Sequence, residues 1–195
     1  MASSAEEIRH QLEDTARVKQ GISDELIGRI AQFAEKSAEA LRGGGKIVFF
    51  GNGGSAADAL HLAAELVVKL HTDRGGLAAL ALTTNPSVLT AAGNDYGFER
   101  IFSRQIESLV APQDILVALS TSGGSLNVIA ALEEARKRGN VTVALLGYDG
   151  GEVVRRGLAD HSIVVRSDYI PRVQEAQATI YHTMRYAIEW LADAR

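Results

Sequence analysis

The sequence contains no cysteine, which excludes disulfide bonds, thiolate catalysis and cysteine-bound zinc. It also has no apolar run of about 18 residues, so no transmembrane helix is expected. Residues 1–20 are charged and polar without a continuous apolar core, which indicates that no secretory signal peptide is present. We therefore expect a cytoplasmic protein without membrane contacts.

An excess of basic residues is also missing. Lysine and arginine total 20 against 24 acidic residues, and the net charge of -4 argues against a nucleic-acid-binding protein. A dinucleotide G-x-G-x-x-G fingerprint and a Walker lysine are absent too, which disfavours a nucleotide ligand. What is present is ordinary for a globular protein, with 46% hydrophobic and 23% charged residues in 195 positions. This length predicts one domain over residues 1–195.

Helical patterns over residues 3–20 and about 23–41 precede the glycine run 43–45. Their apolar faces could pack on a partner subunit or on the chain's own sheet. Beyond that run, short apolar strands alternate with helices, which is typical of a parallel sheet covered on both faces, a three-layer α/β sandwich. The expected strands are Lys46–Phe50, Leu77–Leu82, Asp114–Leu119, Val141–Leu146 and His161–Val165. The expected helices are 55–70, a broken region around 86–110, 125–138, roughly 151–158 and about 171–194.

The segment from Gly51 to Glu65 combines a strand end, a glycine-rich turn and a helix start. Glycines let backbone N–H groups approach an anion, and Ser55 could both cap the helix and donate a hydroxyl hydrogen bond. Two turns into the helix, His61 and Glu65 are four residues apart and share a face. The segment therefore predicts an anion site followed by a metal-ligand or acid/base pair.

A second turn of this kind follows the third expected strand. Its sequence, Ser120-Thr121-Ser122-Gly123-Gly124-Ser125, offers four hydroxyls and two glycines. The alternative is a polar turn in which Ser125 caps the next helix. Two such turns favour a single phosphate on a small molecule as the ligand.

Two further polar groups have simple alternatives. Asn94 and Asp95 lie between glycines in an expected loop, and serve either turn formation or contact with sugar hydroxyls. Gln174 and His182 are eight residues apart in the last helix, about 80° around its axis, so both can face one cleft. The alternative for His182 is a core histidine bonded to a neighbour.

Together these stretches resemble the sugar isomerase (SIS) domain family and, within it, the phosphoheptose isomerases. The motifs that carry the resemblance are Gly51–Asp58 with His61 and Glu65, Gly93–Gly97 followed by Phe102–Gln105, Ser120–Gly123 with Ser125 and Asn127, and Gln174-Glu175 with His182. The resemblance implies a flavodoxin-like SIS fold with five parallel strands. It also implies a homotetramer with active sites at subunit interfaces, in which residues 1–44 contribute to packing or oligomerisation.

The implied reaction converts sedoheptulose 7-phosphate into D-glycero-D-manno-heptose 7-phosphate through an enediolate, a step of heptose biosynthesis. The resemblance assigns acid/base catalysis to Glu65 and His182. It assigns one zinc ion per subunit to His61, Glu65, Gln174 and His182. It assigns substrate binding to Asn52, Gly53, Gly54, Ser55, Glu65, Asn94, Asp95, Ser120, Thr121, Ser122, Ser125 and Gln174. Catalysis and metal binding compete for Glu65 and His182, and both uses stay open here.

Several positions depart from the family pattern near the expected sugar-recognition residues. These are Lys69, Tyr169, Ile170 and Gln177. They leave two alternatives to the isomerase above: an isomerase of a related sugar phosphate, and a non-catalytic SIS module that binds a sugar phosphate or acts as a scaffold.

Overall fold

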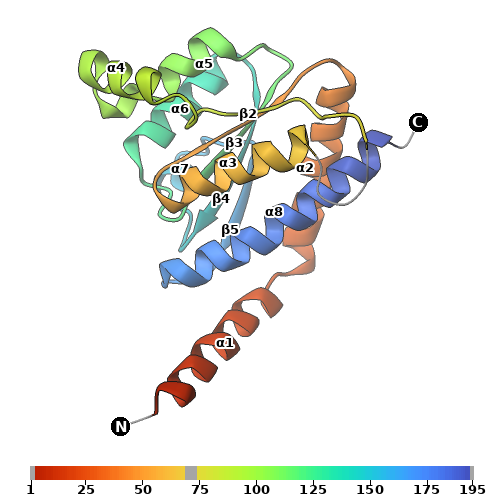
Figure 1. Ribbon diagram of the computed structural model, residues 1–195, viewed down its shortest axis with the longest axis vertical. Helices are drawn as coiled ribbons and strands as arrows, with labels where there is room; N and C mark the ends of the chain where they lie inside the picture. The colour runs from red at the N-terminus through yellow and green to blue at the C-terminus, as the bar shows by residue number, and fades with distance from the viewer. Residues whose placement is uncertain (1–2, 69–73, 194–195) are drawn as a thin grey trace.

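Five short apolar runs form one parallel sheet, as the strand–helix alternation predicts. The computed structural model describes residues 3–68 and 74–193, and the sheet has the strand order β2-β1-β3-β4-β5 (Figure 1). The strands are β1 (Ile47–Gly51), β2 (Ala79–Ala81), β3 (Ile115–Ser120), β4 (Val141–Gly147) and β5 (His161–Val165). The three-layer α/β fold and its five parallel strands are therefore confirmed.

The order of the strands creates a switch point between β1 and β3. The chain proceeds from β1 to β2 on one side, then returns to place β3 on the other side of β1. Gly51 at the end of β1 is paired with Leu119 of β3, so the two glycine-rich turns leave the sheet side by side. Ligands of doubly wound sheets bind at such a switch point, beyond the carboxyl ends of the strands.

Successive residues of the strands point alternately into two separate hydrophobic layers. Phe49 packs into the layer covered by α2 (Asp24–Arg42), α3 (Gly54–Val67) and α8 (Ile170–Asp193), while Phe50 packs into the opposite layer. That opposite layer is covered by α4 (Pro86–Tyr96), the 3-10 helix η1 (Phe98–Arg100), α5 (Ser103–Leu109), α6 (Leu126–Lys137) and α7 (Gly151–Arg155). The central strands β1, β3 and β4 are thus buried on both faces, which explains their continuous apolar sequences.

The N-terminal helices behave differently from each other. Helix α2 contributes Ile30, Phe33 and Ala34 to the core, so it packs on the chain's own sheet. Helix α1 (Ser4–Gln20) projects away from the body and has no buried residue (Figure 1). Its apolar Ile8 and Leu12 are exposed. Own-sheet packing therefore applies to α2 but not to α1.

Two local predictions were wrong. The loop expected around Asn94 is the last turn of α4, because the Asn85 side chain caps the helix start and the chain leaves the helix only at Gly97, with φ of +89°. Strand β2 is shorter than Leu77–Leu82, since only Ala79–Ala81 pair with β1. None of the described helices is both long enough and apolar enough to cross a membrane. Lys69 lies outside the described residues, as does the end of the helix expected over 55–70.

Candidate active site

The turn after β1 presents uncapped backbone donors. Gly53 is the N-cap of α3, with φ of +55° and ψ of -121°, a conformation that favours glycine. No side chain caps this helix, so the predicted capping by Ser55 was wrong; Ser55 lies in the first turn and is buried. First-turn N–H groups without a cap suit an anion.

The turn after β3 is shaped by its own serines. Ser120 Oγ accepts a hydrogen bond from Gly123 N at 3.1 Å, and Ser122 Oγ accepts one from Gly124 N at 3.2 Å. Ser125 is the N-cap of α6, although its side chain makes no capping bond. These bonds fix the shape of the turn, and the hydroxyl protons of Ser120 and Ser122 are still available for donation.

An amide pair joins the two turns. Asn52 and Asn127 exchange side-chain hydrogen bonds, both at 2.8 Å. Gln174 of α8 lies against the start of α3. A Cβ on Gly54 would lie 2.6 Å from Gln174 Nε2, so a larger residue at this position would displace the Gln174 amide. Five of the residues predicted to contact substrate thus line one place: Asn52, Gly53, Gly54, Ser55 and Gln174.

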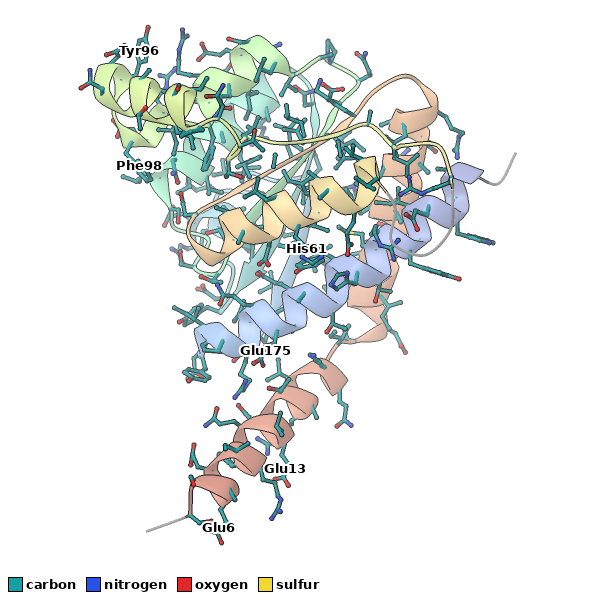
Figure 2. All side chains as sticks on the ribbon, viewed as in Figure 1. Glu6, Glu13, His61, Tyr96, Phe98 and Glu175 are labelled. Carbon is teal, nitrogen blue, oxygen red and sulfur yellow. The ribbon has the colours of Figure 1, made fainter. Side chains whose placement is uncertain are left out.

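Further along α3, two histidines and a carboxylate converge. His61 Nε2 lies 2.9 Å from Glu65 Oε1, and His182 Nδ1 lies 3.3 Å from Glu65 Oε2. Their ligand atoms all lie within 4.8 Å of one another. Glu65 is only 7% exposed, whereas both imidazoles reach solvent. Figure 2 shows His61 between α3 and α8, the two helices that supply the group.

Two imidazoles and one carboxylate are a donor set that suits zinc, and the same groups can carry protons between neighbouring atoms of a substrate. Gln174 precedes His182 by eight residues, roughly 12 Å of helix rise. Its amide contacts Gly54 at the start of α3. The structure therefore gathers His61, Glu65 and His182, with Gln174 at the adjoining turn.

A tyrosine–aspartate pair supports the histidines and was not singled out from the sequence. Tyr181 donates its hydroxyl hydrogen bond to Asp58 Oδ1 at 3.2 Å, and its ring centroid lies 4.8 Å from that of His182. Burial raises the pKa of Asp58, while the Tyr181 hydrogen bond and the nearby histidines oppose this increase. Burial also raises the pKa of the Tyr181 phenol. Helical spacing carried a signal, because Asp58 precedes His61 by three residues and shares its face.

Asn94 and Asp95 lie elsewhere in the chain. Both are exposed at the end of α4, where Asn94 Nδ2 donates to Asp95 Oδ1 at 2.8 Å. Helix α4 covers the opposite face of the sheet from α3 and α8. Figure 2 marks this helix end by Tyr96, well away from His61 in that view. One chain alone thus does not bring this pair to His61, Glu65 and His182.

The residues that depart from the family pattern also differ in how deeply their side chains are buried. Tyr169 and Ile170 are half-exposed at the start of α8 and can face a ligand. Gln177 is fully buried, so its side chain does not reach the surface of this chain. Neither atom of its amide has a hydrogen-bond partner within residues 3–68 and 74–193.

The chain is similar to several known proteins. The SIS domain model matches residues 11–147. A phosphoheptose isomerase of Geobacter sulfurreducens is 49% identical over 184 residues, which cover 94% of this chain and 96% of that protein. One from Geotalea daltonii is 51% identical over 179 residues, 92% of each chain. The solved phosphoheptose isomerase of Neisseria gonorrhoeae superposes with a TM-score of 0.89 at 38% identity, covering 96% of this chain and all of that one.

Proposed function

Because this chain belongs to the SIS domain family and, within it, to the phosphoheptose isomerases, we propose that it converts sedoheptulose 7-phosphate into D-glycero-D-manno-heptose 7-phosphate. The activity is an aldose–ketose isomerisation that supplies heptose biosynthesis. The observation that carries the proposal is the convergence of His61, Glu65 and His182 along the helix that begins at the first of two phosphate-type turns.

The reaction moves one proton between neighbouring carbons. A base removes a proton from C1 of the ketose, the C1–H electron pair forms the C1=C2 bond, and the C2 oxygen takes up a proton. The resulting enediol then loses the proton on the C1 oxygen and regains one at C2, so that atoms and charge balance. Two groups must exchange acid and base roles in these steps.

Glu65 and His182 are suited to these two roles. Glu65 is a buried carboxylate suited to take up a carbon-bound proton, and His61 approaches its Oε1 while His182 approaches its Oε2. His182 lies 3.3 Å from the same oxygen and reaches solvent, which suits it to transfer protons at the substrate oxygens. We assign Glu65 to the carbon protons and His182 to the oxygen protons.

The same residues fit a zinc ion. His61, Glu65 and His182 supply nitrogen and oxygen donors already within 4.8 Å of one another, and Gln174 is the fourth ligand that the resemblance implies. When bound, the metal would polarise the carbonyl and stabilise negative charge on the substrate oxygens. Glu65 would then serve both as a ligand of the ion and as the group that exchanges the carbon-bound proton.

The residues of the two turns are assigned partly to the phosphate and partly to the sugar chain of the substrate. The uncapped start of α3 and the hydroxyl-rich turn after β3 support a phosphate site, for which we assign Ser55, Ser120, Thr121, Ser122 and Ser125. The sugar chain is assigned to Asn52, Gly53, Gly54, Glu65, Gln174, Asn94 and Asp95. Because Asn94 and Asp95 lie on the opposite face of the sheet, we assign them to the site of a neighbouring subunit.

A homotetramer is supported by apolar side chains that one chain leaves uncovered. Ile8 and Leu12 on α1 are 61% and 66% exposed, and Tyr186 and Trp190 on α8 are 66% and 67% exposed. Burial of such side chains between copies favours assembly. We therefore propose a cytoplasmic tetramer of single SIS domains spanning residues 1–195, in which residues 1–44 contribute to the interfaces.

Turnover of sedoheptulose 7-phosphate by the purified protein tests the proposal, with aldose formation followed over time. We expect conversion by the wild-type tetramer. Conversion of another ketose phosphate instead would favour an isomerase of a related sugar. A folded tetramer that binds sugar phosphate but converts none of several ketose phosphates would favour the non-catalytic module and overturn the enzyme.

A further inference from the structure

A buried arginine faces the catalytic carboxylate without completing a hydrogen bond. Arg185 Nε and Glu65 Oε2 lie 3.4 Å apart, and each is buried without a hydrogen-bond partner among the described residues. The Arg185 side chain is 4% exposed and Glu65 is 7% exposed, so water does not screen the pair. A donor and an acceptor that both lack partners therefore lie opposite each other, a small rotation away from a charge-assisted hydrogen bond.

Arg185 is itself held by a carboxylate on its own helix. Its Nη1 bonds to Glu189 one turn further along α8. Arg74 bonds to the same carboxylate, with Nε 2.9 Å from Glu189 Oε1. Arg74 also donates to the main-chain oxygens of Glu65 and Leu66, at 3.2 and 3.0 Å, in the last turns of α3.

These contacts close a ring that begins and ends at Glu65. It runs from the Glu65 carboxylate through Arg185, Glu189 and Arg74 back to the Glu65 backbone. Two guanidinium groups balance two carboxylates, so the ring is neutral, which limits the cost of burying its charges. The arrangement ties the side chain of Glu65 and its own helix end to the same buried framework.

We propose that Arg185 is a positioning residue that fixes which oxygen of Glu65 faces the reacting atoms. His61 approaches Oε1 at 2.9 Å, while His182 and Arg185 approach Oε2 at 3.3 and 3.4 Å. With Arg185 anchored, the carboxylate plane is held by partners on both oxygens. Without it, Oε2 keeps only the solvent-exposed His182, and the carboxylate can rotate away from the orientation that serves a metal ion or a substrate proton.

The part of this inference that concerns turnover rests on the proposed isomerase, whereas the part that concerns metal binding does not. Arg185→Met removes the guanidinium while keeping an apolar side chain of similar length. We expect kcat on sedoheptulose 7-phosphate to fall about 10–100-fold with KM unchanged, and Zn²⁺ affinity, measured by titration with the metal alone, to fall by a similar factor. Arg185→Lys keeps the charge but has one ammonium for two partners, so both quantities should lie between wild type and Arg185→Met.

Arg172→Met is the matched control. Arg172 lies on the same helix and its side chain is 5% exposed, but its acidic partners are Asp14 and Glu175 rather than Glu65. We expect this variant to lose stability while it keeps wild-type kcat and Zn²⁺ affinity. An equal fall in both variants would reduce Arg185 to a general stabilising residue and overturn the proposal.

Wild-type kcat and Zn²⁺ affinity in Arg185→Met would overturn it as well. Should that variant not fold, Arg185→Lys decides, because wild-type values in both measurements would show that the two-contact geometry is not needed. If the wild-type protein binds Zn²⁺ but converts no ketose phosphate, the proposed function fails separately. A weakened Zn²⁺ affinity in Arg185→Met would then still support the positioning role.

Discussion

Helix α8 carries two buried arginines that differ in how completely they are paired. Arg172 donates from all three of its nitrogens: to Asp14 at 3.1 Å, to Glu175 at 2.6 Å and to Gln11. Arg185 lies about three and a half turns later and bonds to Glu189, while its Nε faces Glu65 without a completed bond. Both side chains are about equally buried, so burial alone does not distinguish them.

We infer that this difference separates a structural network from a functional one. The satisfied arginine attaches α1, which has no buried residue of its own, to the body of the protein. Arg185, whose pairing is incomplete, lies against the carboxylate of Glu65, the candidate catalytic residue. Buried polar groups are normally paired, and an exception in a native fold points to a ligand, an ion or a moving proton.

The largest contrast is expected between the carboxylates that the two arginines face. Glu65→Gln replaces the carboxylate by an amide of the same shape that cannot accept a carbon-bound proton, so kcat should fall by about 10²–10⁴. Glu175→Gln makes the same change at the Arg172 end and should keep kcat near wild type. Steady-state kinetics on sedoheptulose 7-phosphate measure both, with circular dichroism to verify folding.

His182→Gln should behave like Glu65→Gln, because the second acid/base group is lost. Wild-type rates in either variant would remove that residue from its catalytic role. A large loss in Glu175→Gln would instead mean that the two ends of α8 are not functionally separate.

Metal removal should affect the end of α8 that carries His182 and leave the Arg172 network at the other end unchanged. Chelation is expected to abolish most turnover and to lower the unfolding temperature, because Zn²⁺ at a thousandfold excess over its Kd contributes about 4 kcal/mol of stability. Arg172→Met should keep the full zinc-dependent increase in unfolding temperature, since its network contains none of His61, Glu65 and His182. Full activity in protein shown to be metal-free would favour acid/base chemistry by Glu65 and His182 alone.

A smaller effect is expected from the structural arginine. Arg172→Met should lower the free energy of unfolding by about 2 kcal/mol, because Asp14 and Glu175 lose a buried partner. Cleavage of α1 by a protease should become faster, since these contacts attach the helix. Urea denaturation and limited proteolysis measure the two effects; an unchanged cleavage rate would show that α1 is held by other contacts.

Much of this organisation could be predicted from the chain itself. Continuously apolar runs such as Ile47–Phe50 are typical of strands buried on both faces, and the structure has a parallel sheet covered on both sides. The four-residue spacing of His61 and Glu65 placed both on one face of a helix, where they contact each other at 2.9 Å. Local periodicity suffices for such features because both residues belong to one element.

The remaining features depend on contacts between elements, which spacing along the chain does not encode. In the sequence, Arg185 is simply one more charged residue of the last helix. Only the packing of α8 against α3 brings it to Glu65. Gly93 suggested a loop, yet it lies inside α4, where a Cβ would meet Ile101 only at 3.7 Å. Gln177 lay close to the predicted site in sequence, but the helix turns it fully into the core.

The smallest expected effect is a difference between the two ends of α8 in how stability depends on pH. Burial raises the pKa of Glu175, but the hydrogen bonds from Thr15 and Arg172 outweigh it, so the net pKa is below the ordinary 4.5. A depressed pKa stabilises the fold above pH 4.5 and loses that contribution as the pH falls through the folded-state value. Glu175→Gln should therefore cost less than about 1 kcal/mol at neutral pH, because the half-exposed pair is screened, and the difference from wild type should shrink below pH 4.5.

Urea denaturation of both proteins at pH 7 and at acidic pH measures this difference. Asp58, beside the histidines, should show the opposite pH dependence. Its pKa is raised, chiefly by burial, so its ionisation weakens the fold as the pH rises above the ordinary 3.8. Asp58→Asn should consequently gain stability relative to wild type at neutral pH and lose that gain in acid. If both variants showed the same pH trend, the two ends of α8 would not differ in their charge balance, and the contrast between Arg172 and Arg185 would rest on geometry alone.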